Sequence, residues 1–138
     1  MGIPERIALS LLSLALLTLF LPGCDRGSPR ASSAVEIRWK EVGSWRGHGD
    51  LQTEAFTSDT GGFRVRWDTR GESPPGAGRL RVVFHSGDSG REIMEAVDTH
   101  GNGSGTAEVG DRPRWYFLTI ESANLDWTVT VEEPVSQE

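Results

Sequence analysis

Cysteine and lysine are almost absent from this chain of 138 residues, since Cys24 and Lys40 are the only residues of their kinds. A single cysteine excludes a disulfide within the chain, so the folded part must be stabilised by its core alone. Acidic residues outnumber basic ones by 20 to 14, for a net charge of −6. This balance argues against nucleic acid as a ligand, because nucleic-acid binding needs clustered cations that face the phosphates.

Long apolar runs are also scarce, and the one that exists covers residues 7–21, interrupted only by Ser10, Ser13 and Thr18. A bilayer-spanning helix needs roughly 20 apolar residues, which is more than this run supplies. The run has no polar face at helical spacing, as a helix of a globular core would have. A short apolar run after a basic residue and before small residues is typical of a secretory signal, so the sequence predicts export.

The tetrapeptide Leu-Pro-Gly-Cys at 21–24 follows this run and resembles the lipobox of bacterial lipoproteins. The resemblance implies cleavage between Gly23 and Cys24, attachment of lipid (acyl chains such as palmitate) to the Cys24 thiol, and often acylation of the new amino terminus. Pro22 departs from the family pattern, which prefers a small or β-branched residue there. Two or more acyl chains hold a protein stably on a membrane. The alternative is an ordinary signal peptide followed by a domain with one free thiol.

This interpretation places the protein on a cell membrane, anchored by lipid at the exported face, whether periplasmic or extracellular. Asp25 resembles a signal that retains some Gram-negative lipoproteins in the inner membrane, but the sequence leaves the choice of membrane open. The predicted organisation is a signal peptide (1–23), a lipidated cysteine and flexible tether (24–34), one domain (35–133) and a short tail (134–138). As a flexible coil, residues 25–34 would span roughly 17 Å.

From Val35 onward the dominant period is two, which is typical of half-buried strands. Four segments show it: VEIRW (35–39), FRVRWD (63–68), RLRVVFHS (79–86) and DWTVTVEE (126–133). The residues predicted to face the core are Val35, Ile37 and Trp39; Phe63, Val65 and Trp67; Leu80, Val82 and Phe84; and Trp127, Val129 and Val131. RWYFLTIES (114–122) is apolar on both faces, which predicts a central strand covered on each side. Weaker strand candidates are residues 51–57, 92–98 and 105–109.

Gly- and Asn-rich turn signals separate these segments, and no stretch after residue 34 keeps a helical period with caps. We therefore predict an all-β fold: a single antiparallel β-sandwich of about seven to eight strands. A closed barrel is the alternative.

Residues 43–67 combine a Trp, two spaced glycines, a Thr-x-x-Phe and a Val-x-Trp, and Trp127, Val129 and Val131 add a final Trp-x-Val-x-Val. This pattern resembles the core segment of small exported bacterial proteins and lipoproteins of uncharacterised function. The resemblance implies a β-sandwich and no established activity. The residues themselves agree, with Phe56 among the predicted core aromatics. Gly47 and Gly49 are expected to allow close backbone approach beside Trp45.

Trp39, Trp45 and Arg46 are the candidate ligand-binding residues. An exposed Trp45 beside Arg46 and Asp50 could stack on a sugar ring, but the favoured interpretation is that Trp45 closes one end of the sandwich.

Two motifs suggest enzyme or metal chemistry only weakly. Gly-Asp-Ser-Gly at 87–90 resembles the nucleophile motif of chymotrypsin-like proteases, and His48 precedes Asp59 and Asp68 in the matching order. The chain is far shorter than that family's double barrel, so a hairpin turn is favoured. Residues 98–104 resemble part of a calcium loop, but Val109 stands where the bidentate Glu belongs, so a hairpin is favoured there too. His48, His85 and His100 lack the spacing of zinc ligands.

These observations predict a non-enzymatic binding or structural module of the bacterial cell envelope, anchored by lipid, with no cofactor and no metal. The expected partners are the membrane and an envelope protein. A carbohydrate- or small-ligand-binding domain is the alternative. A hydrolase using His48, Asp50 and Ser89 is a less favoured one.

Overall fold

The computed structural model describes residues 36–135. The predicted signal peptide, the lipidated Cys24 with the cleavage site after Gly23, and the tether all lie outside these residues. Within them, no helix is long and apolar enough to cross a membrane.

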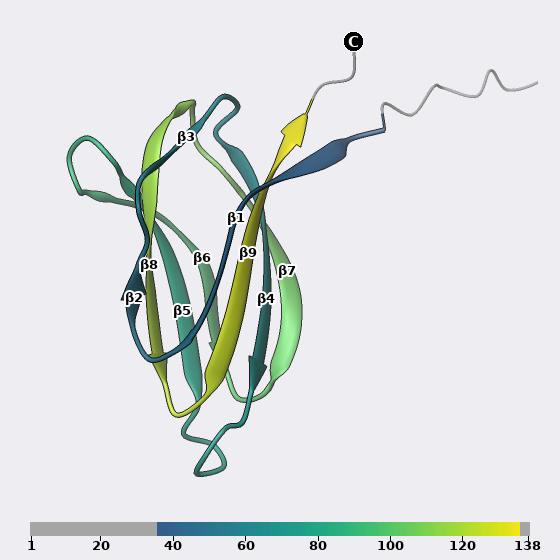
Figure 1. Cartoon of the computed structure of the whole chain (residues 1–138), viewed down its shortest axis with the longest axis vertical. Helices are drawn as coiled ribbons and strands as arrows, with labels where there is room; N and C mark the ends of the chain where they lie inside the picture. Colours follow the sequence, from purple (N-terminus) through teal and green to yellow (C-terminus); the bar gives the residue numbers. More distant parts are fainter. Residues whose placement is uncertain (1–35, 136–138) are drawn as a thin grey trace, which may run out of the picture. The chain divides into compact units, whose positions relative to one another are not determined.

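The described chain forms nine strands (Figure 1). They are β1 (Arg38–His48), β2 (Leu51–Gln52), β3 (Phe56–Ser58), β4 (Gly62–Arg70), β5 (Arg79–Ser86), β6 (Glu92–His100), β7 (Gly103–Gly110), β8 (Arg114–Ala123) and β9 (Asp126–Val135). β9 extends two residues beyond the domain boundary predicted at residue 133. Most of the predicted strands are confirmed, including the weaker candidates 92–98 and 105–109. The candidate 51–57 instead forms two short strands with a break at 53–55, and β1 begins only at Arg38 and continues to His48, beyond the predicted segment 35–39.

Two antiparallel sheets pack face to face, which confirms the predicted β-sandwich rather than a closed barrel. Sheet A has the strand order β1-β9-β4-β7, and sheet B has the order β2-β8-β5-β6, with β3 also paired to β8. From β6 to β9, successive strands alternate between the sheets. If the short β2 and β3 count as one strand, this is the order of a jelly roll, a double-sheet sandwich of two Greek keys.

The core lies between the sheets and consists of the alternate residues that the sequence predicts to face inward. Fully or almost fully buried are Phe63, Val65, Leu80, Val82, Phe84, Trp127, Val129 and Val131, joined by Tyr116, Leu118 and Ile120 of β8. Aromatic rings fill one end of it. The ring of Phe63 lies 4.8 Å from that of Phe84 and meets Tyr116 edge-on at 5.1 Å, both favourable ring distances.

The prediction for VEIRW is wrong, because Ile37 is 57% exposed and Trp39 points to the outer face of sheet A. The cause is a β-bulge between Glu41 and Gly43. An extra residue reverses the alternation, so odd-numbered residues face outward before the bulge and inward after it. Val35 lies outside the described residues.

β8 is a central strand, as predicted, but its outer face is not fully covered by the described chain. Trp115 is 51% exposed. Phe117, two residues on, is covered by the imidazole of His85, which stacks on it at 4.9 Å.

Three indoles of sheet A each lie against a glycine of an edge strand. Gly47 of β1 pairs with Trp127, and Gly105 of β7 pairs with Trp67. A Cβ on Gly47 would come within 3.0 Å of the Trp127 ring, and one on Gly105 within 2.6 Å of the Trp67 ring. Gly43 leaves the same kind of space for Trp45. An aromatic residue that covers an edge glycine replaces the packing that the glycine lacks.

The expectation that Gly47 and Gly49 flank Trp45 is therefore wrong. Gly47 accommodates Trp127 instead, while Gly49 adopts a φ of +102° in a turn, where an added Cβ would meet no atom within 4 Å. Such a positive φ is readily available only to glycine.

The connection from β7 to β8 is fixed by Tyr116, whose hydroxyl donates to the carbonyl oxygen of Arg112 and lies 3.2 Å from Asp111 Oδ2. This arrangement is a tyrosine corner, a feature of Greek-key sandwiches. Burial raises the pKa of Tyr116 above its ordinary value near 10, and the Asp111 carboxylate raises it further.

We predict that Gly105→Ala lowers the free energy of unfolding by about 1–3 kcal/mol, the usual cost of overpacking, because Trp67 must move. Gly103→Ala is the matched control, since it lies on the same strand with the same indole 4.0 Å away. We expect the control to change stability by less than about 1 kcal/mol. Urea denaturation measures both, and equal losses would contradict the packing described.

We also predict that the chain's single tyrosine ionises above its ordinary pKa of about 10 while the protein is folded. Because the folded state holds the proton more tightly than the unfolded state, this stabilisation is fully present below pH ~10. It is lost as the pH rises through the folded pKa. Phenolate absorbance during a pH titration gives the midpoint. Asp111→Asn should lower the midpoint without returning it to the ordinary value, because burial is the larger cause of the raised pKa. A midpoint at the ordinary value in the unmodified protein would contradict the burial of Tyr116 in the tyrosine corner.

Candidate functional site

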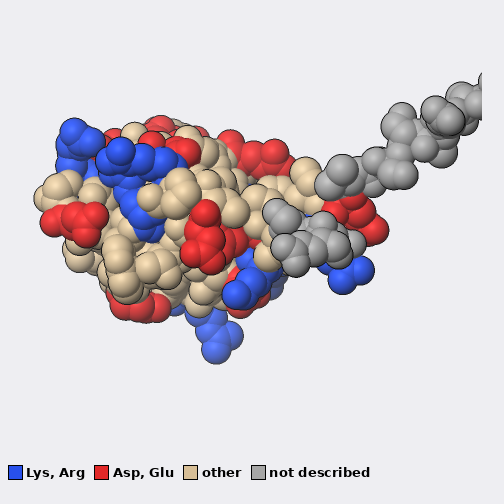
Figure 2. All heavy atoms as spheres, turned by 90° about the horizontal axis from the view of Figure 1, so that it is seen from above, with Lys and Arg blue, Asp and Glu red and all other residues tan. Residues whose placement is uncertain are grey.

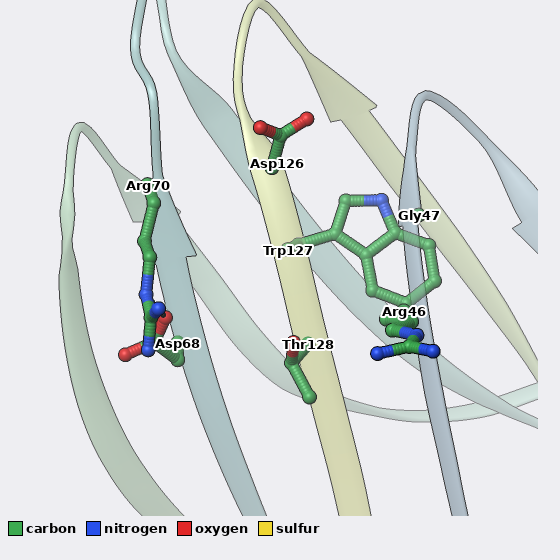
Figure 3. Close-up of a pocket in the computed structure, with 7 residues that line it drawn as sticks. All are labelled: Arg46, Gly47, Asp68, Arg70, Asp126, Trp127 and Thr128. Carbon is green, nitrogen blue, oxygen red and sulfur yellow. Dashed lines mark hydrogen bonds and ion pairs between the residues drawn. The ribbon is translucent and has the colours of Figure 1, made fainter.

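The outer face of sheet A carries two shallow hollows of about 370 and 280 Å³ that share Asp68 and Thr128 in their lining. We call them together the outer trough. Its other lining residues are Arg46, Gly47, Arg70, Asp126 and Trp127 in the first hollow (Figure 3), and Arg66, Trp67, Ser104, Gly105, Thr106 and Thr130 in the second. The trough crosses all four strands of the sheet, about 14 Å at the usual strand spacing.

Strand register brings these side chains together. In one row across the sheet, Arg46 lies opposite Thr128, Thr128 opposite Asp68, and Asp68 opposite Ser104. The neighbouring row is Ser44, Thr130, Arg66 and Thr106. Side chains that are directly opposite have Cβ atoms about 4.5–5.5 Å apart. The rows therefore place hydroxyl groups in the middle of the face with arginine and aspartate beside them.

Two ion pairs at one end of the trough hold three of its charged lining groups, Asp68, Arg70 and Asp126. Arg70 Nε lies 2.6 Å from Asp68 Oδ1, and this hydrogen bond raises the pKa of Arg70 above its ordinary value. Asp126 Oδ1 lies 2.9 Å from His48 Nδ1. Arg46, by contrast, forms no ion pair with any residue of the described chain, and it is exposed. An anionic group in the trough would therefore find an arginine already available.

Toward the start of β1, the charged side chains on the outer face of sheet A are paired with one another. The Glu132 carboxylate is buried and receives Arg64 Nε at 2.6 Å and Arg66 at 3.3 Å. The indole of Trp39 lies against the Arg64 guanidinium, 4.4 Å from ring centroid to Cζ. These contacts use the polar groups at this end, so the open part of the face is the trough.

The three predicted ligand-binding residues do not form one site. Arg46 lines the trough, whereas Trp39 belongs to the group around Glu132 at the other end of β1. Trp45 points inward, 6.3 Å from the ring of Phe56, and packs against the core. It occupies the structural position that the sequence favours.

Asp68, Thr128 and Ser104 are not among the ligand-binding residues expected from the sequence, in which Asp68 is a candidate only for a protease-like triad. Asp68 and Thr128 stand at outward positions of correctly predicted strands, and Ser104 is the second residue of β7, whose predicted start is residue 105. The polar alternation was therefore visible, but the register that sets these residues in one row was not.

Each hollow also has one Trp–Gly pair in its lining: Gly47 with Trp127, and Gly105 with Trp67. The outer face is thus hollowed at the positions where an edge glycine lies against a central-strand indole.

The residues of the hydrolase alternative do not converge. His48 is paired with Asp126, and Asp50 accepts a hydrogen bond from the backbone N–H of Ser122 at 2.9 Å. Ser89 lies in the turn that follows the end of β5. His48, the last residue of β1, lies at the end of the domain where β5 starts, and the length of β5 between the two is roughly 23 Å. The turn interpretation of Gly-Asp-Ser-Gly is confirmed: Gly90 has a φ of +74° and its N–H donates to Ser86 at 2.8 Å.

The hairpin expected for the calcium-like segment is not formed, because this segment connects two sheets: it leads from β6 in sheet B to β7 in sheet A. Asp98 pairs with Arg79, and Asn102 Oδ1 accepts a hydrogen bond from the Glu72 N–H at 2.9 Å. Across residues 36–135, no group of three or more His, Cys, Asp or Glu side chains is placed to hold a metal ion.

The outer face of sheet B is organised differently, around Arg81. This guanidinium pairs with Glu92, Glu95 and Glu121, and hydrogen bonds to Glu95 and Glu121 raise its pKa. Figure 2 looks onto the end of the sandwich where β1 begins and shows acidic and basic side chains interspersed. That end does not present the continuous basic surface that nucleic acid requires.

No protein-family model matches the chain, and no curated protein matches it either. The trough is therefore interpreted from its own geometry.

Proposed function

We propose that the chain is a non-enzymatic binding module, held on the exported face of a bacterial membrane by lipid on Cys24, that binds a hydroxyl-rich acidic ligand such as an envelope polysaccharide in the outer trough. The observation that carries the binding proposal is the row Arg46–Thr128–Asp68–Ser104 across an open face. The anchor rests on the sequence of residues 7–24.

The chemistry of the trough supports a polar and extended ligand. Threonine and serine hydroxyls both donate and accept hydrogen bonds, and carboxylates such as Asp126 accept from sugar hydroxyls. Arg46 supplies a charge-assisted donor for a carboxylate or phosphate on the ligand. Enclosed pockets for small apolar ligands are lined mostly by hydrophobic side chains, whereas the trough is open and has arginine, aspartate, threonine and serine in its lining.

The place of the trough also suits an anchored protein. Arg38, the first residue of β1, is only 14 residues after Cys24 in the sequence. Arg46 lies eight residues further along β1, roughly 25 Å from the end where the chain enters the sandwich. With the entry end toward the membrane, the trough lies in the half of the domain that is distant from the lipid.

We predict that protein extracted from membranes of its native host begins at Cys24 and carries added acyl mass. Intact-mass spectrometry measures this directly. Cys24→Ser should lose the acyl mass and move to the soluble exported fraction. A native species cleaved elsewhere, with a free thiol, would contradict the anchor and leave the binding proposal to be judged separately.

We predict that Arg46→Ala weakens binding to acidic oligosaccharides by roughly 10- to 100-fold, the value of one hydrogen bond to a charged group. Arg91→Ala removes an exposed arginine from the opposite end of the domain and should leave binding unchanged. The measurement is affinity for uronic-acid and neutral oligosaccharides, compared among the three proteins. Loss of binding in Trp115→Ala but not in Arg46→Ala would instead locate binding on sheet B.

A further inference from the structure

The two sheets end in four edges, each of which exposes backbone N–H and C=O groups along a strand. Sheet A ends in β1 and β7, and sheet B ends in β6 and in the pair β2 and β3. An exposed edge is a template for pairing with another strand, and proteins usually block it with charge, bulges or short strands.

Three of the four edges are blocked in this way. β1 contains a bulge between Glu41 and Gly43, with charged residues on both sides of it. β6 has two register shifts and carries Glu92, Glu95 and Asp98. β2 and β3 have only two and three residues.

β7 has none of these protections. Its eight residues, Gly103–Gly110, pair with β4 without a register shift. The only charged residue among them is Glu108, and the outward-facing Ser104 and Thr106 are small and exposed. A long, regular and nearly uncharged edge of small residues is suited to pairing with another strand.

We propose that β7 pairs antiparallel with β7 of a second copy of this chain, joining two copies of sheet A into one continuous sheet. The pairing itself does not depend on the proposed ligand. A second copy fits because the strand is self-complementary in one register. With Thr106 opposite Thr106 across a two-fold axis, Glu108 of each copy lies opposite Ser104 of the other.

Other registers are less favourable. A shift of one residue in the pairing would place outward residues opposite inward ones, which the pleat forbids. Moving the axis to Ala107 brings the two Glu108 side chains to diagonal positions, and moving it to Glu108 sets them directly opposite, which is repulsive. The Thr106 register also places Val109 opposite Gly103 on the inner face, a large residue against a small one.

Pairing of this kind would set two outer troughs side by side, because Ser104, Gly105 and Thr106 line the second hollow. If the proposed ligand is a polymer, one strand of it could contact both copies, and bivalent contact strengthens binding without any new type of interaction.

The test is disulfide crosslinking of the full-length chain in membranes, using Thr106→Cys with copper phenanthroline as the oxidant. Opposite residues of an antiparallel pair have Cα atoms about 4.5–5.5 Å apart, within the range a disulfide spans. We expect Thr106→Cys to give a linked dimer. Ser104→Cys and Glu108→Cys should crosslink when the two are mixed, but not alone. The unmodified chain controls for Cys24, and Ser44→Cys, exposed on the other edge of sheet A, is the matched control position.

Crosslinking of Thr106→Cys no greater than that of Ser44→Cys would overturn the proposal. As a second variant, Thr106→Lys sets two like charges opposite each other and should weaken the dimer severalfold in sedimentation experiments on the detergent-extracted protein. A dimer unaffected by Thr106→Lys would place the interface elsewhere and also overturn the proposal. None of these outcomes bears on Arg46 and the ligand, so the two proposals fail independently.

Discussion

The constraint on which the rest of the structure depends is the space that three indoles take at the edges of sheet A. Trp67, Trp127 and Trp45 point into the sandwich, and each requires a neighbouring residue without a Cβ. The glycines at 43, 47 and 105 meet that requirement and leave both edge strands thin. Because the indole rings lie inside the sandwich, the outer face at these positions is hollow. The side chains that project from it are charged, or are polar and short.

The trough follows from this packing together with strand register. Residues far apart in sequence, such as Arg46 and Ser104, become members of one row because β9 and β4 lie between their strands. Around the trough, charged groups form ion pairs with one another: Glu132 with Arg64 and Arg66, and Asp68 with Arg70. The same glycine-rich composition that accommodates Trp67 makes β7 a regular edge with a single charged residue, Glu108. One packing solution thus underlies both the surface proposed for ligand binding and the edge proposed for self-association.

Much of the fold was readable from the sequence, since period-two alternation identified the buried residues of β4, β5 and β9 correctly. It failed where local geometry changed the alternation. The bulge after Glu41 turned Trp39 outward, and no residue in VEIRW signals it. The sequence places Gly47 beside Trp45, whereas it lies opposite Trp127, because cross-strand partners depend on register, which a single sequence does not display. Arg46 was identified as a candidate because of its neighbours in sequence, whereas the residues that complete its row come from three other strands.

The ligand is proposed to lie on the outer face of sheet A. Amide chemical shifts of the isotope-labelled protein, followed while a uronic-acid oligosaccharide is added, test this most directly. The account predicts shifts concentrated at Arg46, Asp68, Thr128 and Ser104, with little change on sheet B. Shifts concentrated around Trp115 and Phe117, or confined to the turns, would contradict it.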